Sequence, residues 1–176
     1  MWEALSRTLM NTRADSTTVY HLEMCSRDEL RPSSAPAGFE IVMNTPPTAK
    51  LNRHFYQAVG ELWEWTDRLS WSDDDWRKYV QRETLETWVG RFHGQAAGYF
   101  ELEVQQKGIV EIKYFGLLPE FIGQGLGGPL LTAAIERAWA IPMTQRLWVH
   151  TCTRDHERAL DNYLQRGFKL FKTESV

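Results

Sequence analysis

The sequence has few cysteines, no long apolar run and no excess of positive charge. Its 176 residues include two cysteines, Cys25 and Cys152, whose separation matches neither a disulfide framework nor a zinc site. No run of about 18 apolar residues is present, so no membrane-spanning helix is predicted. Basic residues number 20 and acidic residues 23, a balance that argues against general nucleic-acid binding, which depends on neutralising phosphates. We therefore expect a cytoplasmic protein with neither nucleic-acid nor membrane partners.

The apolar content is ordinary, and the length fits one domain. Apolar residues make up 43% of the chain, enough for a substantial core. The first residues lack the uninterrupted apolar stretch of a secretory signal. Arg7 and Arg13 are loosely typical of an organelle transit peptide, but the acidic residues among them favour a polar leader. We predict a flexible leader over residues 1–16 and a single domain over residues 17–176.

Apolar periodicity predicts a mixed α/β domain. Alternation predicts strands over residues 19–24, 39–43, 86–92, 97–105, 109–117, 146–152 and 168–172. Helical spacing predicts helices over residues 51–69, 73–80, 130–138 and 156–165. Ser72 and the three aspartates after it are typical of a helix start. Turns at His93-Gly94 and Lys107-Gly108 join the middle strands into an antiparallel set.

A glycine-rich loop between a strand and a helix is the most informative stretch. Glycines at positions 123, 125, 127 and 128 follow Leu118-Pro119. Glycine leaves backbone N–H groups accessible and a helix N-terminus adds partial positive charge, so the loop can cradle phosphate. The loop lacks the Lys-Ser or Lys-Thr ending of a P-loop and does not match the dinucleotide fingerprint. Taken alone, it is equally consistent with a tight turn that binds nothing.

A second block, residues 159–168, has the pattern A-x-x-x-Y-x-x-x-G-F. With the strand, Leu-Pro-Glu and Gly-x-Gly-x-Gly turn of residues 110–131, it resembles the GNAT superfamily of acyl-coenzyme-A-dependent N-acetyltransferases. The resemblance covers about residues 17–173. It implies an α/β (α+β) GNAT fold. In that fold a mixed central sheet is splayed between the fourth and fifth family strands, and helices cover both faces.

The resemblance also implies acetyl-CoA as cosubstrate and no metal. The gap between the splayed strands would accept the pantetheine arm, and the glycine loop would bind the pyrophosphate. The implied cofactor-binding residues are Phe115, Leu117, Leu118, Gly123, Gln124, Gly125, Leu126, Gly127, Gly128, His156 and Asn162.

Two positions depart from the family pattern. Ile122 stands where relatives usually have Arg or Gln, and His156 stands where an Asn is common. A charged contact to phosphate is then missing, and we expect weaker cofactor binding rather than none.

Tyr163 matches the tyrosine that protonates the departing thiolate in many relatives. A phenol titrates near ~10, so it is protonated at neutral pH and can donate. The alternative is that Tyr163 only packs on its helix.

Glu111 lies where several relatives have a general base. Strand alternation predicts that Glu111, Lys113 and Phe115 share one face. The alternative is a solvated carboxylate paired with Lys113. Glu101 and Glu103 on the neighbouring strand are further candidates for the base.

Tryptophans crowd the two helices that wall the acceptor site in this family. The segment 61–83 also has seven acidic and four basic residues, which suits a cationic amine with an apolar part. Trp63, Trp65 and Trp71 are the candidate substrate-binding residues, although helical spacing also fits a core role for most of them.

His150, Cys152 and His156 cluster in sequence. A metal site needs three or four ligands with one focus, and a strand histidine with a buried thiol is the favoured interpretation.

Together these residues predict an N-acetyltransferase. It would transfer an acetyl group from acetyl-CoA to a primary amine of a small molecule by direct attack, as a monomer or homodimer. Two alternatives stay open: an acyl-CoA-binding regulatory module without turnover, and an acetyltransferase acting on protein or peptide amines.

Overall fold

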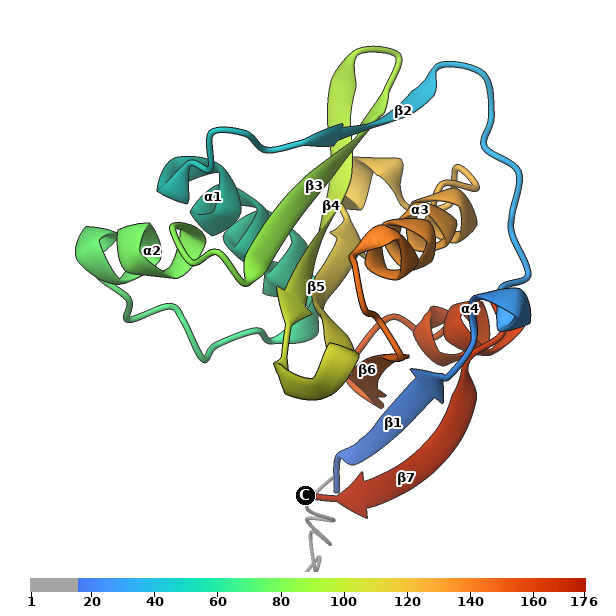
Figure 1. Ribbon diagram of the computed structural model, residues 1–176. Coiled ribbons are helices and arrows are strands. Elements are labelled where there is room, and N and C mark those ends of the chain that lie inside the picture. Colours follow the sequence, from blue (N-terminus) through green and yellow to red (C-terminus); the bar gives the residue numbers. More distant parts are fainter. Residues whose placement is uncertain (1–15) are drawn as a thin grey trace, which may run out of the picture.

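A computed structural model describes residues 16–176 as seven strands in one mixed sheet. The predicted leader lies outside the described residues, except for residue 16. The strand order is β2-β3-β4-β5-β6-β1-β7. The strands are β1 (Thr18–Met24), β2 (Phe39–Met43), β3 (Leu85–Phe92), β4 (Gln95–Val104), β5 (Ile109–Leu117), β6 (Arg146–Cys152) and β7 (Lys169–Ser175). Strand β1, from the start of the described chain, lies between β6 and β7, from its end (Figure 1).

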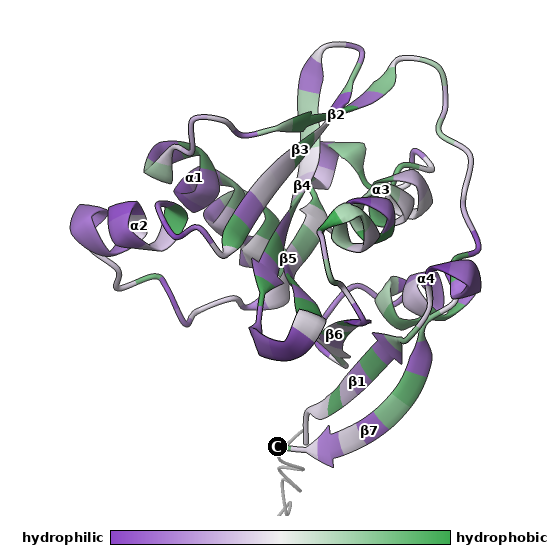
Figure 2. Ribbon diagram, viewed as in Figure 1, coloured by the Kyte–Doolittle hydropathy of each residue, from purple (hydrophilic) through white to green (hydrophobic). Residues whose placement is uncertain are grey.

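Four helices cover the two faces of the sheet (Figure 1). Helices α1 (Ala49–Gly60) and α2 (Asp73–Val80) lie on one face, and α3 (Gly127–Ala140) and α4 (Ala159–Gln165) lie on the other. The α3/α4 face buries a large aliphatic cluster, whereas tyrosine and tryptophan side chains form the cluster beneath α1 and α2. Most of α2 is hydrophilic in Figure 2, because only Trp76, Tyr79 and Val80 of this short helix are buried. The predicted fold class is confirmed.

Local start and turn signals are confirmed in detail. The Ser72 side chain accepts a hydrogen bond from the backbone N–H of Asp75, and the Asp75 carboxylate accepts one from the backbone N–H of Ser72. These reciprocal bonds satisfy free N–H groups at the start of α2. His93 and Gly94 have φ values of 49° and 79°, as a two-residue hairpin turn requires.

The predicted first helix is too long. Helix α1 ends at Gly60, and Glu64 then has a left-handed backbone with φ of 56°. The Trp65 ring packs so closely on Gly60 that an added Cβ would lie 2.6 Å from Trp65 Cβ. The local packing of Trp65 on Gly60 therefore overrides the helical spacing and ends the helix.

Two C-terminal boundaries also differ from the prediction. Helix α4 begins at Ala159, not at position 156, because the His156 ring accepts a hydrogen bond from the Arg158 backbone N–H within a turn. Strand β7 begins and ends later than predicted, since it follows β1 out to Ser175.

Strands β5 and β6 separate soon after they meet. Their parallel pairing covers Ile109, Val110 and Glu111, while β5 continues to pair with β4 as far as Leu117. Backbone groups of the second half of β5 that face away from β4 are therefore available to a ligand. This separation confirms the expected splay.

An irregularity in β5 corrects the predicted face pattern. Leu102 pairs with Ile112 but Glu101 pairs with Tyr114, so Lys113 is an extra residue. This bulge shifts the alternation by one position. Glu111 and Tyr114 consequently face α1 and α2, whereas Phe115 packs against Tyr163 of α4. The prediction that Glu111 and Phe115 share a face is wrong.

Candidate functional site

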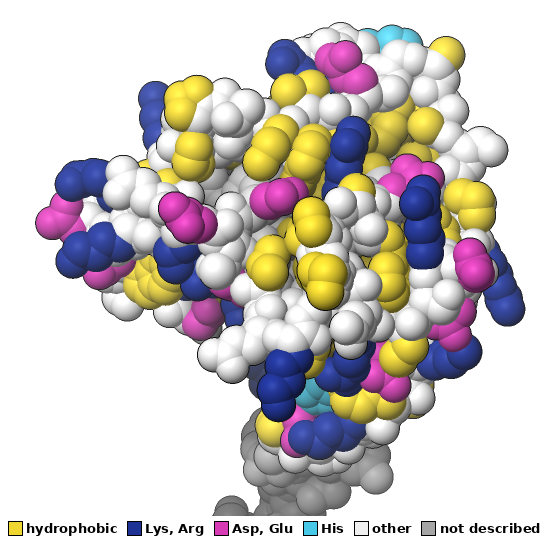
Figure 3. Space-filling view, in the orientation of Figure 1, with side chains coloured by type: hydrophobic (Ala, Val, Ile, Leu, Met, Phe, Trp, Pro, Cys, Tyr) yellow, Lys and Arg dark blue, Asp and Glu magenta, His cyan; other side chains and the backbone are white. Residues whose placement is uncertain are grey.

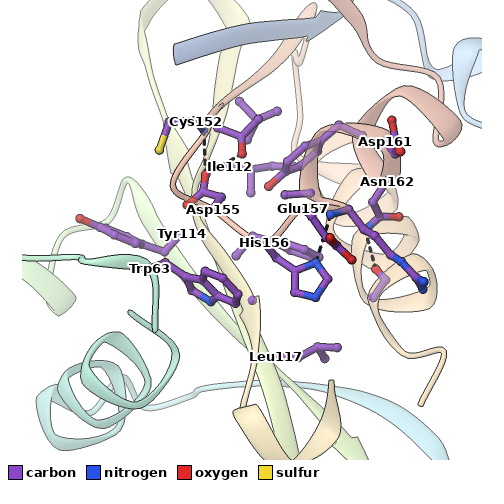
Figure 4. Close-up of a pocket in the computed structure, with 18 of the residues that line it drawn as sticks. Trp63, Ile112, Tyr114, Leu117, Cys152, Asp155, His156, Glu157, Asp161 and Asn162 are labelled. Carbon is purple, nitrogen blue, oxygen red and sulfur yellow. Dashed lines mark hydrogen bonds between the residues drawn. The ribbon is translucent and has the colours of Figure 1, made fainter. Parts of the chain in front are cut away.

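A cleft of about 1420 Å³ occupies the gap between β5 and β6. It extends from the loop before α2, past the second half of β5, to the starts of α3 and α4. Trp63 and Tyr114 come from one wall, and His156 and Asn162 come from the other (Figure 4). The cleft therefore connects the glycine loop with the tryptophan-rich segment.

The glycine loop lies at one end of the cleft. Gly123 and Gly125 have φ values of 84° and 76°, a region that other residues rarely adopt. Within the described chain, no atom lies within 4 Å of a Cβ built on either glycine. Helix α3 starts at Gly127, and no side chain of residues 16–176 caps its first N–H groups. This arrangement fits a pyrophosphate, as the loop sequence predicts.

Arg166 adds a cation beside this loop. Its Nη1 lies close to Gly128, at 2.5 Å from the position that a Cβ would take on that residue. Arg166 Nε is buried and has no hydrogen-bond partner among the described residues. Ile122 also lines the cleft and has no charge to offer. Arg166, which the sequence motif does not single out, is therefore a nearby cation that can pair with phosphate.

Asn162 and His156 both line the cleft, but their roles differ. Asn162 Nδ2 donates to the backbone oxygen of Gly127 at 3.1 Å and so ties α4 to the start of α3. The His156 ring faces Trp63, with the ring centroids 5.4 Å apart (Figure 4). Asn162 therefore fixes the glycine loop at the start of α3, while His156 and Trp63 approach each other across the cleft.

Tyr163 reaches the cleft from α4 and is 6% exposed. It packs between Phe115 and Phe168, with centroid distances of 6.0 and 5.8 Å. Burial, and then the negative charge of Asp155, raise the pKa of Tyr163 far above its ordinary value. The phenol is thus protonated at neutral pH, as a proton donor must be.

Glu111 lies just outside the cleft lining and is 2% exposed. Its carboxylate accepts a hydrogen bond from Gln105 Nε2 at 2.9 Å and lies 3.5 Å from Lys113 Nζ. Burial raises the pKa of Glu111, and Lys113 opposes the shift. On its cleft side, Glu111 Oε1 lies 3.9 Å from Nδ1 of His150, which does line the cleft.

Glu101 and Glu103 both have internal partners. Glu101 is fully buried and accepts hydrogen bonds from Asn52 Nδ2 and from the Tyr79 hydroxyl. Arg68 Nη1 lies 3.8 Å from it. Glu103 pairs with Arg82. Both carboxylates lie away from the cleft and serve the structure.

Two of the three candidate tryptophans line the cleft. Trp63 and Trp65 do so, and Trp65 packs on Tyr114 with a centroid distance of 4.9 Å. Trp71 instead packs on the guanidinium of Arg68, which lies 4.6 Å from its ring centre. Trp71 therefore belongs to the core beneath α2.

Some of the remaining predicted cofactor residues line the cleft and others do not. Phe115, Leu117 and Leu126 line the cleft, and Figure 4 places Leu117 at its lower end. Leu118 is buried beneath α1, and Gln124 is exposed, with its side chain donating to the Glu120 backbone oxygen. The structure also brings to the cleft polar residues that the sequence does not assign to it, namely Asp67, His150, Arg154, Asp155 and Arg166.

Residues 16–176 contain neither a membrane-spanning helix nor a cluster of metal-ligating side chains. No helix there is long and apolar enough to cross a lipid bilayer. No group of three His, Cys, Asp or Glu side chains there is placed to hold a metal ion. The face seen in Figure 3 carries both basic and acidic side chains.

The model of the Acetyltransferase (GNAT) family matches residues 48–168. This match covers most of the chain and includes β5, the glycine loop and α4. The chain belongs to the GNAT acetyltransferase family. No curated protein matches the sequence significantly.

Solved structures share the fold. A GCN5-related N-acetyltransferase from Kribbella flavida aligns with a TM-score of 0.64 and 18% identity, over 90% of this chain and 58% of that one. The corresponding protein from Sphaerobacter thermophilus aligns with a TM-score of 0.69 and 14% identity, over 90% of this chain and 50% of that one. This chain thus spans between half and two thirds of their length.

A third structure is an aminoglycoside acetyltransferase from an uncultured soil metagenomic sample, in complex with sisomicin. It aligns with a TM-score of 0.58 and 15% identity, over 70% of this chain and 84% of that one. At such identities, the likeness establishes the fold.

Proposed function

We propose that this protein transfers an acetyl group from acetyl-CoA to a primary amine of a small molecule. The observation that carries the proposal is the cleft, which joins a phosphate-binding loop to an aromatic and acidic end across the splayed strands. The sisomicin complex of the metagenomic relative supports a small-molecule amine as the substrate class. The cytoplasm would supply the cosubstrate.

The residues present fit acetyl-CoA. Gly123, Gly125 and the start of α3 offer N–H groups to the pyrophosphate, and Arg166 offers a charge. The backbone groups of Phe115 to Leu117 that face away from β4 offer hydrogen bonds to an extended arm. When bound, the cosubstrate supplies a thioester, whose carbonyl carbon accepts an amine nucleophile.

The protein's own groups would act in the following way. Backbone N–H groups of β5 would stabilise the negative charge that develops on the thioester oxygen. Holding donor and acceptor in one cleft would supply a further large part of the rate. Tyr163 would donate its hydroxyl proton to the departing sulfur, because its phenol is protonated and lines the cleft.

The acceptor end fits a cation with an apolar part. Trp63, Trp65 and Tyr114 offer aromatic faces, while Asp67 and Glu64 bring negative charge to the same end of the cleft. Ammonium groups bind such faces favourably when they leave water.

Two measurements test the proposal. Millimolar acetyl-CoA should raise the unfolding temperature. At 100 times its dissociation constant, the ligand should add about 2.7 kcal/mol to the free energy of unfolding. Release of free CoA should then require both the protein and an amine, in a screen of aminoglycosides, polyamines and arylalkylamines. Binding without amine-dependent release would favour the regulatory module. Acetylation of peptides alone would favour the protein acetyltransferase. Failure to bind would refute the proposal.

A further inference from the structure

His150 stands between the buried carboxylate of Glu111 and the cleft. The imidazole is on β6, and half of its side chain (48%) is exposed, whereas the Glu111 side chain is 2% exposed. His150 Nδ1 lies 3.9 Å from Glu111 Oε1. Since β5 and β6 separate after Glu111, His150 lies where the cleft opens. An acceptor amine in the cleft can contact the imidazole directly, whereas Glu111 lies behind it.

Charged groups from several elements surround this imidazole. Lys113 comes from β5, His21 from β1, Asp155 from the turn after β6, and Asp67 from the loop before α2. Burial lowers the pKa of His150, His21 and Lys113 lower it further, and Asp155 and Asp67 oppose them. The imidazole is therefore neutral at physiological pH and holds a free lone pair.

We propose that His150 is the general base that takes the proton from the acceptor ammonium, and that Glu111 is its positioning residue. This inference rests on the acetyltransferase function proposed above. It differs from the expectation that Glu111 itself, or a water chain from it, receives the proton.

The proton balance is as follows. With its own hydrogen on Nδ1, the side nearer Glu111, His150 accepts the ammonium proton on Nε2. The freed nitrogen lone pair forms the bond to the acetyl carbon, and the carbon–sulfur bond breaks. Tyr163 gives its proton to the sulfur, and the second proton of the attacking nitrogen returns through water to the phenolate. The imidazolium, paired with Glu111, then releases its extra proton to solvent. Amine and thioester thus become amide and thiol.

The first test is the pH dependence of turnover. His150→Gln should lower kcat at pH 7 by about 10²- to 10⁴-fold, the usual contribution of a general base, while the Kd for CoA stays unchanged. The acidic limb of the wild-type profile should lie below the ordinary histidine range and vanish in this variant. Imidazole in the buffer should partly restore turnover of His150→Ala. His54→Gln, which changes an exposed histidine on α1, should match wild type.

Glu111→Gln separates positioning from direct base action. The proposal predicts that turnover persists at a reduced kcat, with the acidic limb moved to lower pH, because an anion near the imidazolium is lost. If Glu111→Gln abolished turnover while His150→Gln retained the wild-type profile, Glu111 would be the base and the proposal would be wrong.

A second test needs no turnover. NMR titration should show His150 with a pKa below the ordinary histidine value, and Glu111→Gln should lower that pKa further. If His150 titrates in the ordinary histidine range and does not respond to Glu111→Gln, the dyad is refuted. Absence of turnover in wild type, with CoA bound and the dyad intact in NMR, would refute the proposed acetyl transfer and with it the base role.

Discussion

The two faces of the sheet around β5 differ in the side chains that they bury. Toward α3 and α4, the sheet presents aliphatic side chains such as Leu102 and Ile112, and the groups offered to a phosphate are mainly backbone N–H groups. Toward α1 and α2, it presents two carboxylates, Glu101 and Glu111, both at 2% exposure or less. The proposed binding therefore depends on backbone geometry on one side of the sheet, whereas buried carboxylates distinguish the other side.

The comparison also separates the two carboxylates. Glu101 meets Asn52, Tyr79 and Arg68, and aromatic rings surround that arginine, with the Tyr79 ring centre 3.9 Å from its guanidinium carbon. Glu111 meets Lys113 and Gln105 internally but has His150 on its cleft side. Two glutamates on adjacent strands therefore have different surroundings. Glu101 is enclosed by internal partners, whereas Glu111 lies next to His150 at the cleft.

The largest effect is expected from Glu101→Ala. The change removes the buried countercharge of Arg68 and leaves it only the exposed carboxylate of Asp67, and breaking a buried pair typically costs about 3–5 kcal/mol. For a chain of this size, the unfolding temperature should fall by on the order of 10 °C. Glu40→Ala, which breaks an exposed pair with Arg91, is the control and should cost less than about 1 kcal/mol. If the two variants lowered the unfolding temperature by the same small amount, the contacts of Glu101 with Arg68, Asn52 and Tyr79 would not be important for stability.

Glycine replacements test the backbone side. Gly125→Ala and Gly94→Ala change glycines with φ of 76° and 79°, and neither new Cβ meets a described atom within 4 Å. Both should lose about 1–2 kcal/mol of stability from the left-handed backbone. Only Gly125→Ala should also weaken CoA binding, roughly ten-fold or more in calorimetry, since tenfold corresponds to about 1.4 kcal/mol. Equal CoA affinities in the two variants would argue against the phosphate cradle.

A smaller loss of affinity is expected from Arg166→Gln. The guanidinium would make a charge-assisted bond to phosphate, so CoA should bind several-fold to ten-fold more weakly, or about 1 kcal/mol. Pantetheine, which has no pyrophosphate, should bind both proteins equally. The affinity of the wild-type protein for CoA should also fall more steeply with salt concentration than the affinity of Arg166→Gln. A loss shared by pantetheine would point to a distorted loop instead.

The smallest effect concerns pH and stability. Because burial raises the pKa of Glu111, the folded protein binds that proton more tightly than the unfolded chain. Its contribution to stability is present below the unfolded value near 4.5 and is lost as the pH rises through the folded pKa. Urea denaturation from pH 4.5 to 8 should show wild type losing stability relative to Glu111→Gln, by at most about 1.4 kcal/mol per pH unit. An opposite slope would mean that Lys113 outweighs burial.

Much of the fold could be predicted from local patterns. The boundaries of β2, β5 and β6 agree with the alternation, and the start of α2 agrees with its Ser72 cap. Prediction failed where a specific contact overrode the periodic pattern. Pairing with β1, which is distant in sequence, lengthened β7, and the local packing of Trp65 on Gly60 ended α1 early. Periodicity cannot include contacts between residues that are far apart in sequence.

The candidate site divides in the same way. The glycine loop and Tyr163 could be found from spacing, because a phosphate turn needs glycines in a fixed local order. The bulge at Lys113 could not, and it exchanges the faces of Tyr114 and Phe115. The sequence favours a plain strand histidine over a metal ligand at position 150 and does not indicate a base, since the nearness of His150 to Glu111 exists only where β5 meets β6.

The sequence by itself determined the family, the order of elements and the position of the phosphate loop, because each of these depends on residues close together in the chain. Only the tertiary structure decided which carboxylate lies near the cleft, which tryptophans line it and which cation stands beside Gly128. Those outcomes depend on strand register, one bulge and the packing of α1, α2 and α4. Each of these is set by burial across the whole domain and not by any local pattern.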